Sequence, residues 1–311
     1  MTRQPYRVHP YREVRYLLNS ETGPLHHAAL AFAHRGADPQ RENTMAAFRH
    51  AVQLGYQYVE IDLRTSADGE LVVFHDETLD RITDGCGKLS KKTWAELTQL
   101  RVIGADAKET GLLTSAGELT EQPGAHQAGA SQPEPRAGEP LVRFAEVLEA
   151  FPNTHFNVDL KDDESVEPFV QIVEAQEAHE RVLAASFNDA RRHRVQRLLS
   201  RRVATSGGWA SIALMLLLGP LGLTRGMGRR IAGIDCVQVP IRRGRIRIVT
   251  EAFVERCHRA GLQVHVWVID DREQMHQLLD LGVDGLMTDD AETLAQVMQE
   301  RSVWPQTGQH R

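Results

Sequence analysis

Short apolar runs alternate along most of the chain with segments whose apolar residues recur at helical spacing. This alternation is typical of β-strands that are each followed by a helix and that assemble into a parallel sheet. The pattern therefore predicts an α/β fold. Nine runs are candidate strands: Leu30–Ala33, Tyr58–Val59, Leu71–Phe74, Phe156–Leu160, Val182–Ser186, Arg202–Ala204, Cys236–Val239, Gln263–Val268 and Gly285–Thr288.

Start and stop signals mark the candidate helices between these runs. The first is expected to begin at Met45, with Asn43 or Thr44 as its cap, and to end before Gly55. The other candidates are Phe144–Phe151, Val166–Val173, Glu251–Ala260 and Arg272–Leu281.

The chain has 311 residues, which is long for a single domain but suits one α/β barrel with additions. Such a barrel has eight strand places, so one of the nine candidate runs is extra. We expect the extra run to be Cys236–Val239 or Arg202–Ala204. The barrel is expected to occupy residues 29–298, between an N-terminal extension (1–28) and a C-terminal tail (299–311).

Residues 104–140 differ in composition from the rest of the chain. They are rich in Gly, Pro, Ala and Glu and poor in large apolar side chains. Such a segment buries too little apolar surface to offset the entropy lost on ordering. We predict a flexible, partly disordered surface insertion within a single domain.

Bulk composition narrows the class of protein. Hydrophobic residues make up 41% and charged residues 25%, as in soluble globular proteins. The net charge of −6 gives no electrostatic basis for binding nucleic acid. The three cysteines (Cys86, Cys236 and Cys257) are widely spaced and lack a metal-ligand pattern, which favours free thiols in a reducing cytosol. We expect a cytoplasmic protein without a secretory signal.

The longest apolar segment, Ile212–Leu223, is too short to span a bilayer and is broken by Gly219-Pro220. Buried core or a local lid is the interpretation we favour. The alternative is transient contact with a membrane surface or an acyl chain, which would make the protein peripheral at the membrane.

Polar groups suited to catalysis come directly after the first three candidate strands. His34-Arg35-Gly36 follows the first, Glu60 and Asp62 follow the second, and His75-Asp76 follows the third. In parallel α/β sheets, substrates bind at the carboxyl ends of the strands. This arrangement predicts an enzyme.

The carboxylates predict a metal site. Glu60 and Asp62 are two residues apart, so in a strand they point to the same face and repel each other unless a cation lies between them. Asp159 ends another apolar run and can supply a third carboxylate. Oxygen ligands of this kind suit Mg²⁺ or Ca²⁺. The alternative is an exposed strand with solvated acids and an ordinary salt bridge to Lys161.

His34 and His75 are the natural proton carriers, because an imidazole titrates near neutral pH. Arg35 offers a planar charged group suited to a phosphate, and Lys161 can bind an anion. Together with a metal ion, these groups describe a site for a phosphate ester.

The ordered motifs resemble those of the glycerophosphodiester phosphodiesterase family, over about residues 29 to 298. They are His34-Arg35-Gly36, Glu42-Asn43-Thr44, Glu60-Ile61-Asp62, Asp68-Gly69, His75-Asp76, Asn157-Val158-Asp159-Leu160-Lys161, Ser186-Phe187-Asn188, Val266-Trp267-Val268 and Asp284-Gly285-Leu286-Met287-Thr288-Asp289. Seven or more ordered motifs rarely coincide by chance. The chain departs from the family pattern at Asp159, where glutamate is usual.

The resemblance implies a TIM barrel, the (β/α)8 fold, with one divalent cation, Mg²⁺ or Ca²⁺. The implied roles cover nine side chains. They are metal ligands Glu60, Asp62 and Asp159, acid and base His34 and His75, phosphate contacts Arg35 and Lys161, a wall of the alcohol pocket at Trp267, and a brace for Arg35 or its loop at Glu42.

The implied reaction is hydrolysis of a small-molecule glycerophosphodiester to glycerol 3-phosphate and an alcohol. No nucleic acid and no obligate protein partner is expected. One alternative is a lysophospholipase D that acts on lipid phosphodiesters, with Ile212–Leu223 against the acyl chain. The other is a catalytically silent barrel that binds a phosphorylated ligand or a protein.

Overall fold

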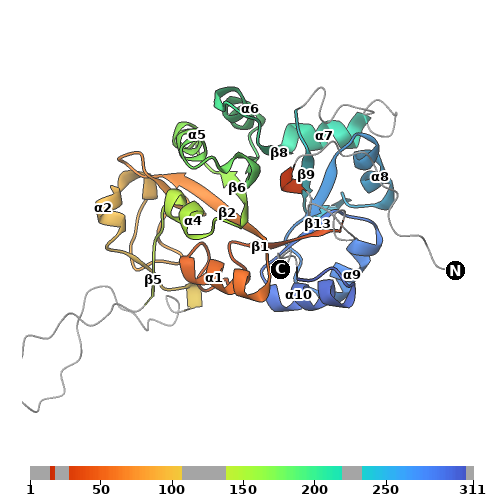
Figure 1. Cartoon of the computed structure of the whole chain (residues 1–311), viewed down its shortest axis with the longest axis horizontal. Coiled ribbons are helices and arrows are strands. Elements are labelled where there is room, and N and C mark those ends of the chain that lie inside the picture. Colours follow the sequence, from red (N-terminus) through yellow and green to blue (C-terminus); the bar gives the residue numbers. More distant parts are fainter. Residues whose placement is uncertain (1–14, 18–27, 107–137, 219–232, 306–311) are drawn as a thin grey trace, which may run out of the picture.

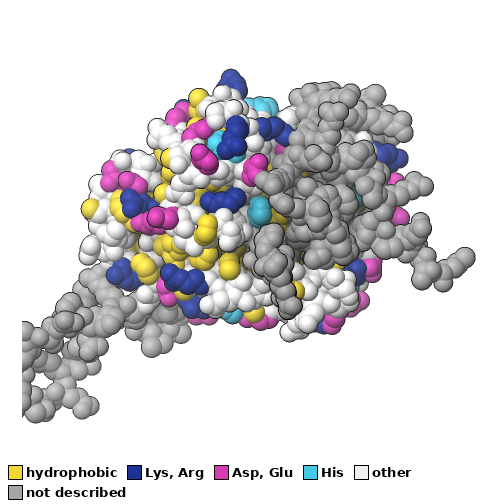
Figure 2. Space-filling view, in the orientation of Figure 1, with side chains coloured by type: hydrophobic (Ala, Val, Ile, Leu, Met, Phe, Trp, Pro, Cys, Tyr) yellow, Lys and Arg dark blue, Asp and Glu magenta, His cyan; other side chains and the backbone are white. Residues whose placement is uncertain are grey.

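The computed structural model describes residues 15–17, 28–106, 138–218 and 233–305. Its helices lie around the outside of a ring of strands (Figure 1). On the face in Figure 2, basic and acidic side chains of the described residues are interspersed, without a large patch of one sign.

Eight parallel strands form a closed barrel, which confirms the predicted TIM barrel. Each strand is hydrogen-bonded to the next in the ring, and β1 also pairs with β2 to close it. The order around the ring is β1 (Leu30–His34), β2 (Tyr58–Thr65), β6 (His155–Leu160), β7 (Val182–Ala185), β8 (Ala204–Gly207), β9 (Cys236–Val239), β12 (Gln263–Val266) and β13 (Gly285–Thr288).

Our choice of the extra strand was wrong. Cys236–Val239 is the barrel strand β9, and the run at Arg202–Ala204 leads into the barrel strand β8. The extra strand is β3 (Leu71–Val73), which pairs antiparallel with the far end of β2. Because β2 is eight residues long, it extends past the end of its partner β6, and β3 covers this overhang.

The predicted helices form close to their expected bounds, and each follows its local signals. In α1, the Thr44 side chain accepts a hydrogen bond from the backbone N–H of Ala47, and Gly55 ends the helix at φ 108°. Four further helices, α2, α6, α7 and α10, were not predicted. The helices are α1 (Met45–Leu54), α2 (Trp94–Leu97), α4 (Phe144–Ala150), α5 (Val166–Ala175), α6 (Asp189–Leu198), α7 (Trp209–Leu218), α8 (Glu251–Arg259), α9 (Arg272–Asp280) and α10 (Ala291–Glu300).

Short elements complete the described chain. They are the 3-10 helices η1 (Arg15–Leu17), η2 (Leu89–Lys91) and η3 (Ala178–Glu180), and the two-residue strands β4 (Arg101–Val102), β5 (Glu139–Pro140), β10 (Arg242–Arg243) and β11 (Ile246–Arg247).

The core has two main parts. The larger one packs the outer face of the barrel against the helices, and the smaller one fills the barrel interior. At the amino-terminal end of the strands, the ring of Tyr16 packs edge-on against Tyr58 and His155. Tyr16 belongs to the predicted N-terminal extension, yet it is buried and closes the bottom of the barrel. Among the described residues, the pocket lies at the opposite end of the barrel.

The predicted insertion (104–140) lies mostly outside the described residues, which omit 107–137. Its two ends are joined by antiparallel pairing of β4 with β5. Residues 219–223 of the apolar segment Ile212–Leu223 and residues 306–311 of the tail also lie outside the described part. Within the described ranges, no helix is both long enough and apolar enough to cross a bilayer.

Candidate active site

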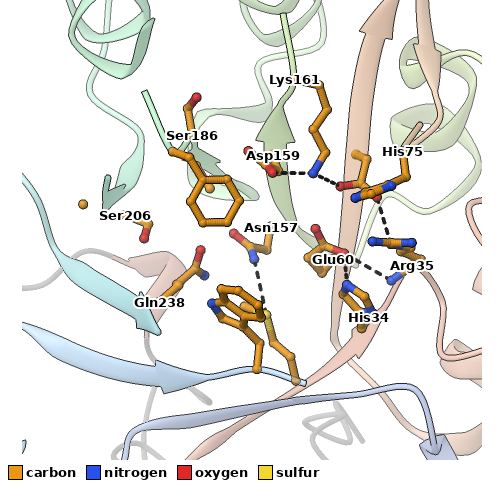
Figure 3. Close-up of a pocket in the computed structure, with 16 residues that line it drawn as sticks. His34, Arg35, Glu60, His75, Asn157, Asp159, Lys161, Ser186, Ser206 and Gln238 are labelled. Carbon is orange, nitrogen blue, oxygen red and sulfur yellow. Dashed lines mark hydrogen bonds and ion pairs between the residues drawn. The ribbon is translucent and has the colours of Figure 1, made fainter. Parts of the chain in front are cut away.

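A pocket of about 240 Å³ opens at the carboxyl ends of the barrel strands. Eight of the nine predicted site residues line it and converge on one cavity (Figure 3). They are His34, Arg35, Glu60, Asp62, His75, Asp159, Lys161 and Trp267.

Strand register places the acidic side chains next to one another. In the pairing of β1 with β2, His34 lies opposite Glu60, and in the pairing of β2 with β6, Asp62 lies opposite Asp159. Alternate residues of β2 point the same way, so Glu60 and Asp62 both face the cavity. Both are buried.

The turn after β1 brings a backbone donor to Glu60. Arg35, Gly36 and Ala37 all have positive φ, at 53°, 91° and 53°. This tight turn aims the backbone N–H of Arg35 at the Glu60 carboxylate, 3.2 Å away. The glycine is required at the centre, because a Cβ there would lie 2.7 Å from the Cβ of Ala47.

The β2–β3 hairpin brings His75 back to the mouth of the barrel. The chain leaves the rim along β2, turns, and returns along β3 until the Phe74 N–H donates to the Asp62 carbonyl at 2.9 Å. His75 thus reaches the pocket from an antiparallel strand, although the sequence pattern suggested a barrel strand.

Lys161 lies between two of the predicted metal ligands. Its ammonium nitrogen is 2.8 Å from Asp62 Oδ1 and 2.7 Å from Asp159 Oδ2. The guanidinium of Arg35 is 3.1 Å from the other oxygen of Asp62. Burial alone would raise the pKa of Asp62, but these two cations outweigh it and hold the pKa well below its usual range.

Glu60 has less compensation. Burial, together with the neighbouring Asp62 carboxylate, raises the pKa of Glu60 to about 7. Besides the N–H of Arg35, its nearest positive partner is His34, whose Nε2 is 3.8 Å away. Glu60 is therefore a buried carboxylate that additional positive charge would stabilise.

The donor atoms fit a hard divalent cation. Asn157 lies beside Glu60 in the β2–β6 register, and its Oδ1 is buried with no hydrogen-bond partner among the described residues. Carboxylate and amide oxygens are the ligands such ions prefer. Across the described chain, no three His, Cys, Asp or Glu side chains already lie in a metal-binding arrangement. The Lys161 ammonium group lies between Asp62 and Asp159.

The two histidines are held in different electrostatic surroundings. His34 Nδ1 lies 2.7 Å from Asp289 Oδ1, and although burial lowers its pKa, Glu60 and Asp289 outweigh burial and raise it. His75 Nδ1 lies 2.7 Å from Asp76 Oδ1. For His75, burial outweighs the nearby Asp62 and lowers the pKa.

Glu42 does not line the pocket. It is buried behind Arg35 and accepts hydrogen bonds from Arg35 Nη1 at 3.1 Å and from Arg81 at 3.0 and 2.6 Å. Arg81 also donates to Asp76 at 2.6 Å. The guanidinium of Arg81 thus connects Glu42, which lies behind Arg35, to Asp76, which holds His75.

The partners of the histidines were missed as functional residues. Asp289 stood in a recognised motif at the end of the last barrel strand, and Asp76 follows His75 directly, but neither received a role. The sequence around Arg81 did not indicate its role, since its partner Glu42 is 39 residues away.

The other half of the pocket is less charged and more aromatic. Trp267 and Phe187 meet edge to face, with ring centroids 6.0 Å apart. Ser206 and Gln238 lie on the same side (Figure 3). This half can hold an alcohol group through apolar contact and a few polar ones.

Comparison with known proteins adds independent evidence. Residues 34–293 match the family described as "Glycerophosphoryl diester phosphodiesterase family". The chain is 35% identical to "Probable glycerophosphodiester phosphodiesterase 2" of Mycobacterium tuberculosis, over 90% of this chain and 94% of the relative. It is 26% identical to "Lysophospholipase D GDPD1" of Homo sapiens, over 83% of this chain and 82% of the relative.

Solved structures share the fold. A glycerophosphoryl diester phosphodiesterase from Silicibacter pomeroyi aligns with a TM-score of 0.69 at 19% identity, covering 93% of this chain and 98% of the other. A phosphodiesterase from Oleispira antarctica, in complex with sn-glycerol-3-phosphate, aligns with a TM-score of 0.65 at 21% identity, covering 88% and 97%. The chain therefore belongs to the glycerophosphoryl diester phosphodiesterase family and is a phosphodiesterase of that class, as its motifs predicted.

Proposed function

We propose that this enzyme hydrolyses glycerophosphodiesters to glycerol 3-phosphate and an alcohol, with His34 and His75 as its proton carriers. The observation that supports this most is the placement of both imidazoles in one pocket with two cationic side chains and three carboxylates. A phosphodiester needs this combination: charge neutralisation at the phosphate, a base for the nucleophile and an acid for the leaving group.

Arg35 and Lys161 would bind the phosphate. Both are already held by carboxylates, so their positive charges are fixed in place before the substrate arrives. Glu42 and Asp62 hold the guanidinium of Arg35 on two sides. Such preorganisation orients the diester for in-line attack.

The opposite pKa shifts favour His34 as the acid and His75 as the base. A raised pKa keeps His34 protonated and ready to donate to the leaving alcohol, while a lowered pKa keeps His75 neutral and ready to accept a proton. The nucleophile that His75 deprotonates would be a water or the neighbouring hydroxyl of the substrate's own glycerol.

Glu60, Asp62 and Asp159 would hold one divalent cation, Mg²⁺ or Ca²⁺, with the Asn157 oxygen beside them. A bound cation supplies positive charge that neutralises the phosphate and the buried carboxylates. Asp159 is one methylene shorter than glutamate, which sets its carboxylate back by about 1.5 Å. In this chain, the shorter side chain of Asp159 therefore leaves space for the Lys161 ammonium group to contact its carboxylate.

Single-site variants and chelation test the proposal. His34→Ala and His75→Ala should each lower kcat for glycerophosphocholine by about 100-fold or more, since each removes one proton transfer. His50→Ala is the matched control, because His50 pairs with Glu292 on the outer surface. Chelation should abolish turnover, and Mg²⁺, Ca²⁺ and Mn²⁺ added back separately should identify the effective ion.

Near-normal hydrolysis by both histidine variants would contradict the proton-transfer roles. Full activity in excess chelator would contradict the cation. A catalytically silent barrel would instead bind glycerol 3-phosphate without hydrolysing any diester.

A second candidate is a lysophospholipase D activity on lipid phosphodiesters. It is favoured by an exposed apolar helix beside the pocket mouth, in which Leu217 is 72% exposed. The human relative that is named a lysophospholipase D is consistent with this candidate. Hydrolysis of lysophosphatidylcholine in preference to glycerophosphocholine would establish it, and the reverse preference would exclude it. For either substrate we propose a cytoplasmic enzyme.

A further inference from the structure

The pocket mouth has two chemically different sides. Charged catalytic candidates come from β1, β2, β6 and the residues just after β1, β3 and β6. The opposite side is built by the segments that follow the carboxyl ends of β7, β8 and β9, and it is apolar and basic. Two elements dominate it: helix α7, which follows β8, and the β10–β11 hairpin, which follows β9. We call these two elements the α7–hairpin surface.

Helix α7 is apolar on all sides. Apart from the indole of Trp209, Ser211 carries the only polar side chain in the helix, and its hydroxyl donates to Asp189 at 2.9 Å. Ile212 and Met215 face the core. The outward face is a stripe at spacings of three and four residues, formed by Ala210, Ala213, Leu214 and Leu217.

This outward stripe is unusual for a helix in contact with water. Leu217 is 72% exposed and Leu214 is 36% exposed. A helix that is hydrophobic all round is normally enclosed by protein or in contact with lipid. An exposed apolar stripe beside a binding site indicates an interaction surface.

The neighbouring hairpin supplies positive charge. Four exposed arginines occupy its six positions from 242 to 247, and residues 240–250 contain no acidic side chain. Among the described residues, none of the four forms an ion pair with a carboxylate. Ile246, the first residue of β11, lies among these arginines and is 65% exposed. The arginines are Arg242, Arg243, Arg245 and Arg247.

Aromatic contacts join this surface to the pocket wall. The guanidinium of Arg243 lies 4.0 Å from the centre of the Trp209 ring. Trp209 stacks on Phe187 with centroids 5.6 Å apart, and Phe187 in turn meets Trp267 inside the pocket. The α7–hairpin surface is therefore continuous with the wall of the site.

We propose that the α7–hairpin surface docks on an anionic phospholipid bilayer. Exposed leucine and isoleucine side chains would enter the interfacial region, while the arginines contact phosphate headgroups. The net charge of −6 opposes association of the protein as a whole with an anionic membrane, so the positive charge of the hairpin would orient the pocket mouth toward the lipid. This rests on the second candidate function above and deepens it: the substrate would be a phosphodiester lipid taken from the membrane surface.

Vesicle sedimentation tests the proposal without requiring turnover. The full-length protein is mixed with vesicles of phosphatidylcholine, with or without phosphatidylglycerol. We expect sedimentation with the anionic vesicles only, and loss of binding at high salt because electrostatic attraction is screened. The variant His34→Ala should bind equally well, so a failure of the proposed chemistry is distinguishable from a failure of docking.

Two double variants separate the contributions of the arginines and of the apolar side chains to vesicle binding. Arg242→Glu with Arg245→Glu, and Leu217→Ser with Ile246→Ser, should each weaken vesicle binding by about tenfold or more. Hydrolysis of water-soluble glycerophosphocholine should stay unchanged in both. The matched control is Arg49→Glu with Arg197→Glu, which makes the same charge change at exposed positions on α1 and α6.

Equal loss of binding in the control would show a general charge effect and overturn the proposal. Wild-type binding in both surface variants, or no vesicle binding by the wild type, would also overturn it. A dimer in solution that Leu217→Ser with Ile246→Ser dissociates would instead assign the surface to a second copy of the chain.

Discussion

At the residue scale, two histidines with the same unperturbed pKa are driven in opposite directions. Each has an aspartate 2.7 Å from its Nδ1. Burial lowers the pKa of both rings. At His34 the charges of Glu60 and Asp289 outweigh burial, whereas at His75 the cations Lys161 and Arg35 oppose the raising effect of Asp62 and burial prevails. The surroundings therefore favour proton donation by His34 and proton acceptance by His75.

The pH dependence of activity should show these shifts. Activity should rise as His75 loses its proton below the usual histidine pKa and fall as His34 loses its proton above it, which gives a bell-shaped profile. Asp289→Asn removes a charge that raises the pKa of His34, so only the alkaline limb should move to lower pH. The measurement is kcat/KM against pH.

Asp76→Asn is the complementary variant. It weakens a contact that raises the pKa of His75, so the acidic limb should move to lower pH and the alkaline limb should stay. Movement of the wrong limb in either variant would contradict the assignment of acid and base.

Arg81 connects the two sides of the catalytic cluster from outside the pocket. It contacts both Glu42 and Asp76, which in turn hold Arg35 and His75. Arg81→Gln should lower kcat/KM by about tenfold, as is usual when a partner of a functional residue is lost. Arg143→Gln is the control, because Arg143 bridges Glu70 and Glu146 away from the pocket. Equal losses in both variants would refute a positioning role for Arg81.

At the scale of elements, two departures from regular βα units build the site. The positive-φ turn after β1 aims a backbone donor at Glu60, and the overhanging β2–β3 hairpin returns His75 to the rim. Neither device contributes to the barrel itself. The barrel strands place the acidic side chains and His34, and these two devices add the Arg35 backbone donor and His75.

The turn after β1 can be tested by adding one methyl group. Gly36→Ala combines left-handed strain at φ 91° with a clash against Ala47, so it should cost about 2 kcal/mol of stability and displace the N–H of Arg35. Gly69→Ala has the same strain at φ 87° without any neighbour within 4 Å, and should cost about 1 kcal/mol. Thermal unfolding and kcat/KM measure both. Activity should fall only in Gly36→Ala, and a matched fall in Gly69→Ala would contradict this.

At the scale of the whole molecule, the barrel is closed at one end and open at the other. Tyr16 blocks the amino-terminal end, and the pocket opens at the carboxyl ends of the strands. The predicted insertion departs from the chain between β4 and β5, which pair with each other. The barrel strands make no ladder contact with either.

Residues 107–137 should therefore be replaceable by a short linker. A Gly/Ser linker of about six residues would close β4 and β5 as a hairpin and raise stability by about 1 kcal/mol, because a shorter loop loses less entropy on closure. Denaturant unfolding and kcat/KM for glycerophosphocholine check this. A less stable or inactive variant would show that the removed segment contributes to the fold or the site.

The sequence by itself determined the βα alternation, the family and the residues that meet in the pocket. Apolar periodicity and caps are local, so most helix bounds could be predicted from neighbouring residues, as in α1. Motifs at strand ends identified His34, Glu60, Asp62 and Asp159 without knowledge of their distances. The apolar helix α7 was recognised only as part of the hydrophobic segment Ile212–Leu223.

Only the tertiary structure decided which apolar run lies outside the barrel and how the charges pair. A run such as Leu71–Val73 has the same local pattern as a barrel strand, and its direction depends on the length of β2 beyond its partner. The ring of strands brings together side chains from different strands. It places Lys161 between Asp62 and Asp159, and it places Asp289 beside His34. Such contacts depend on register and closure, which no local pattern in a single chain encodes.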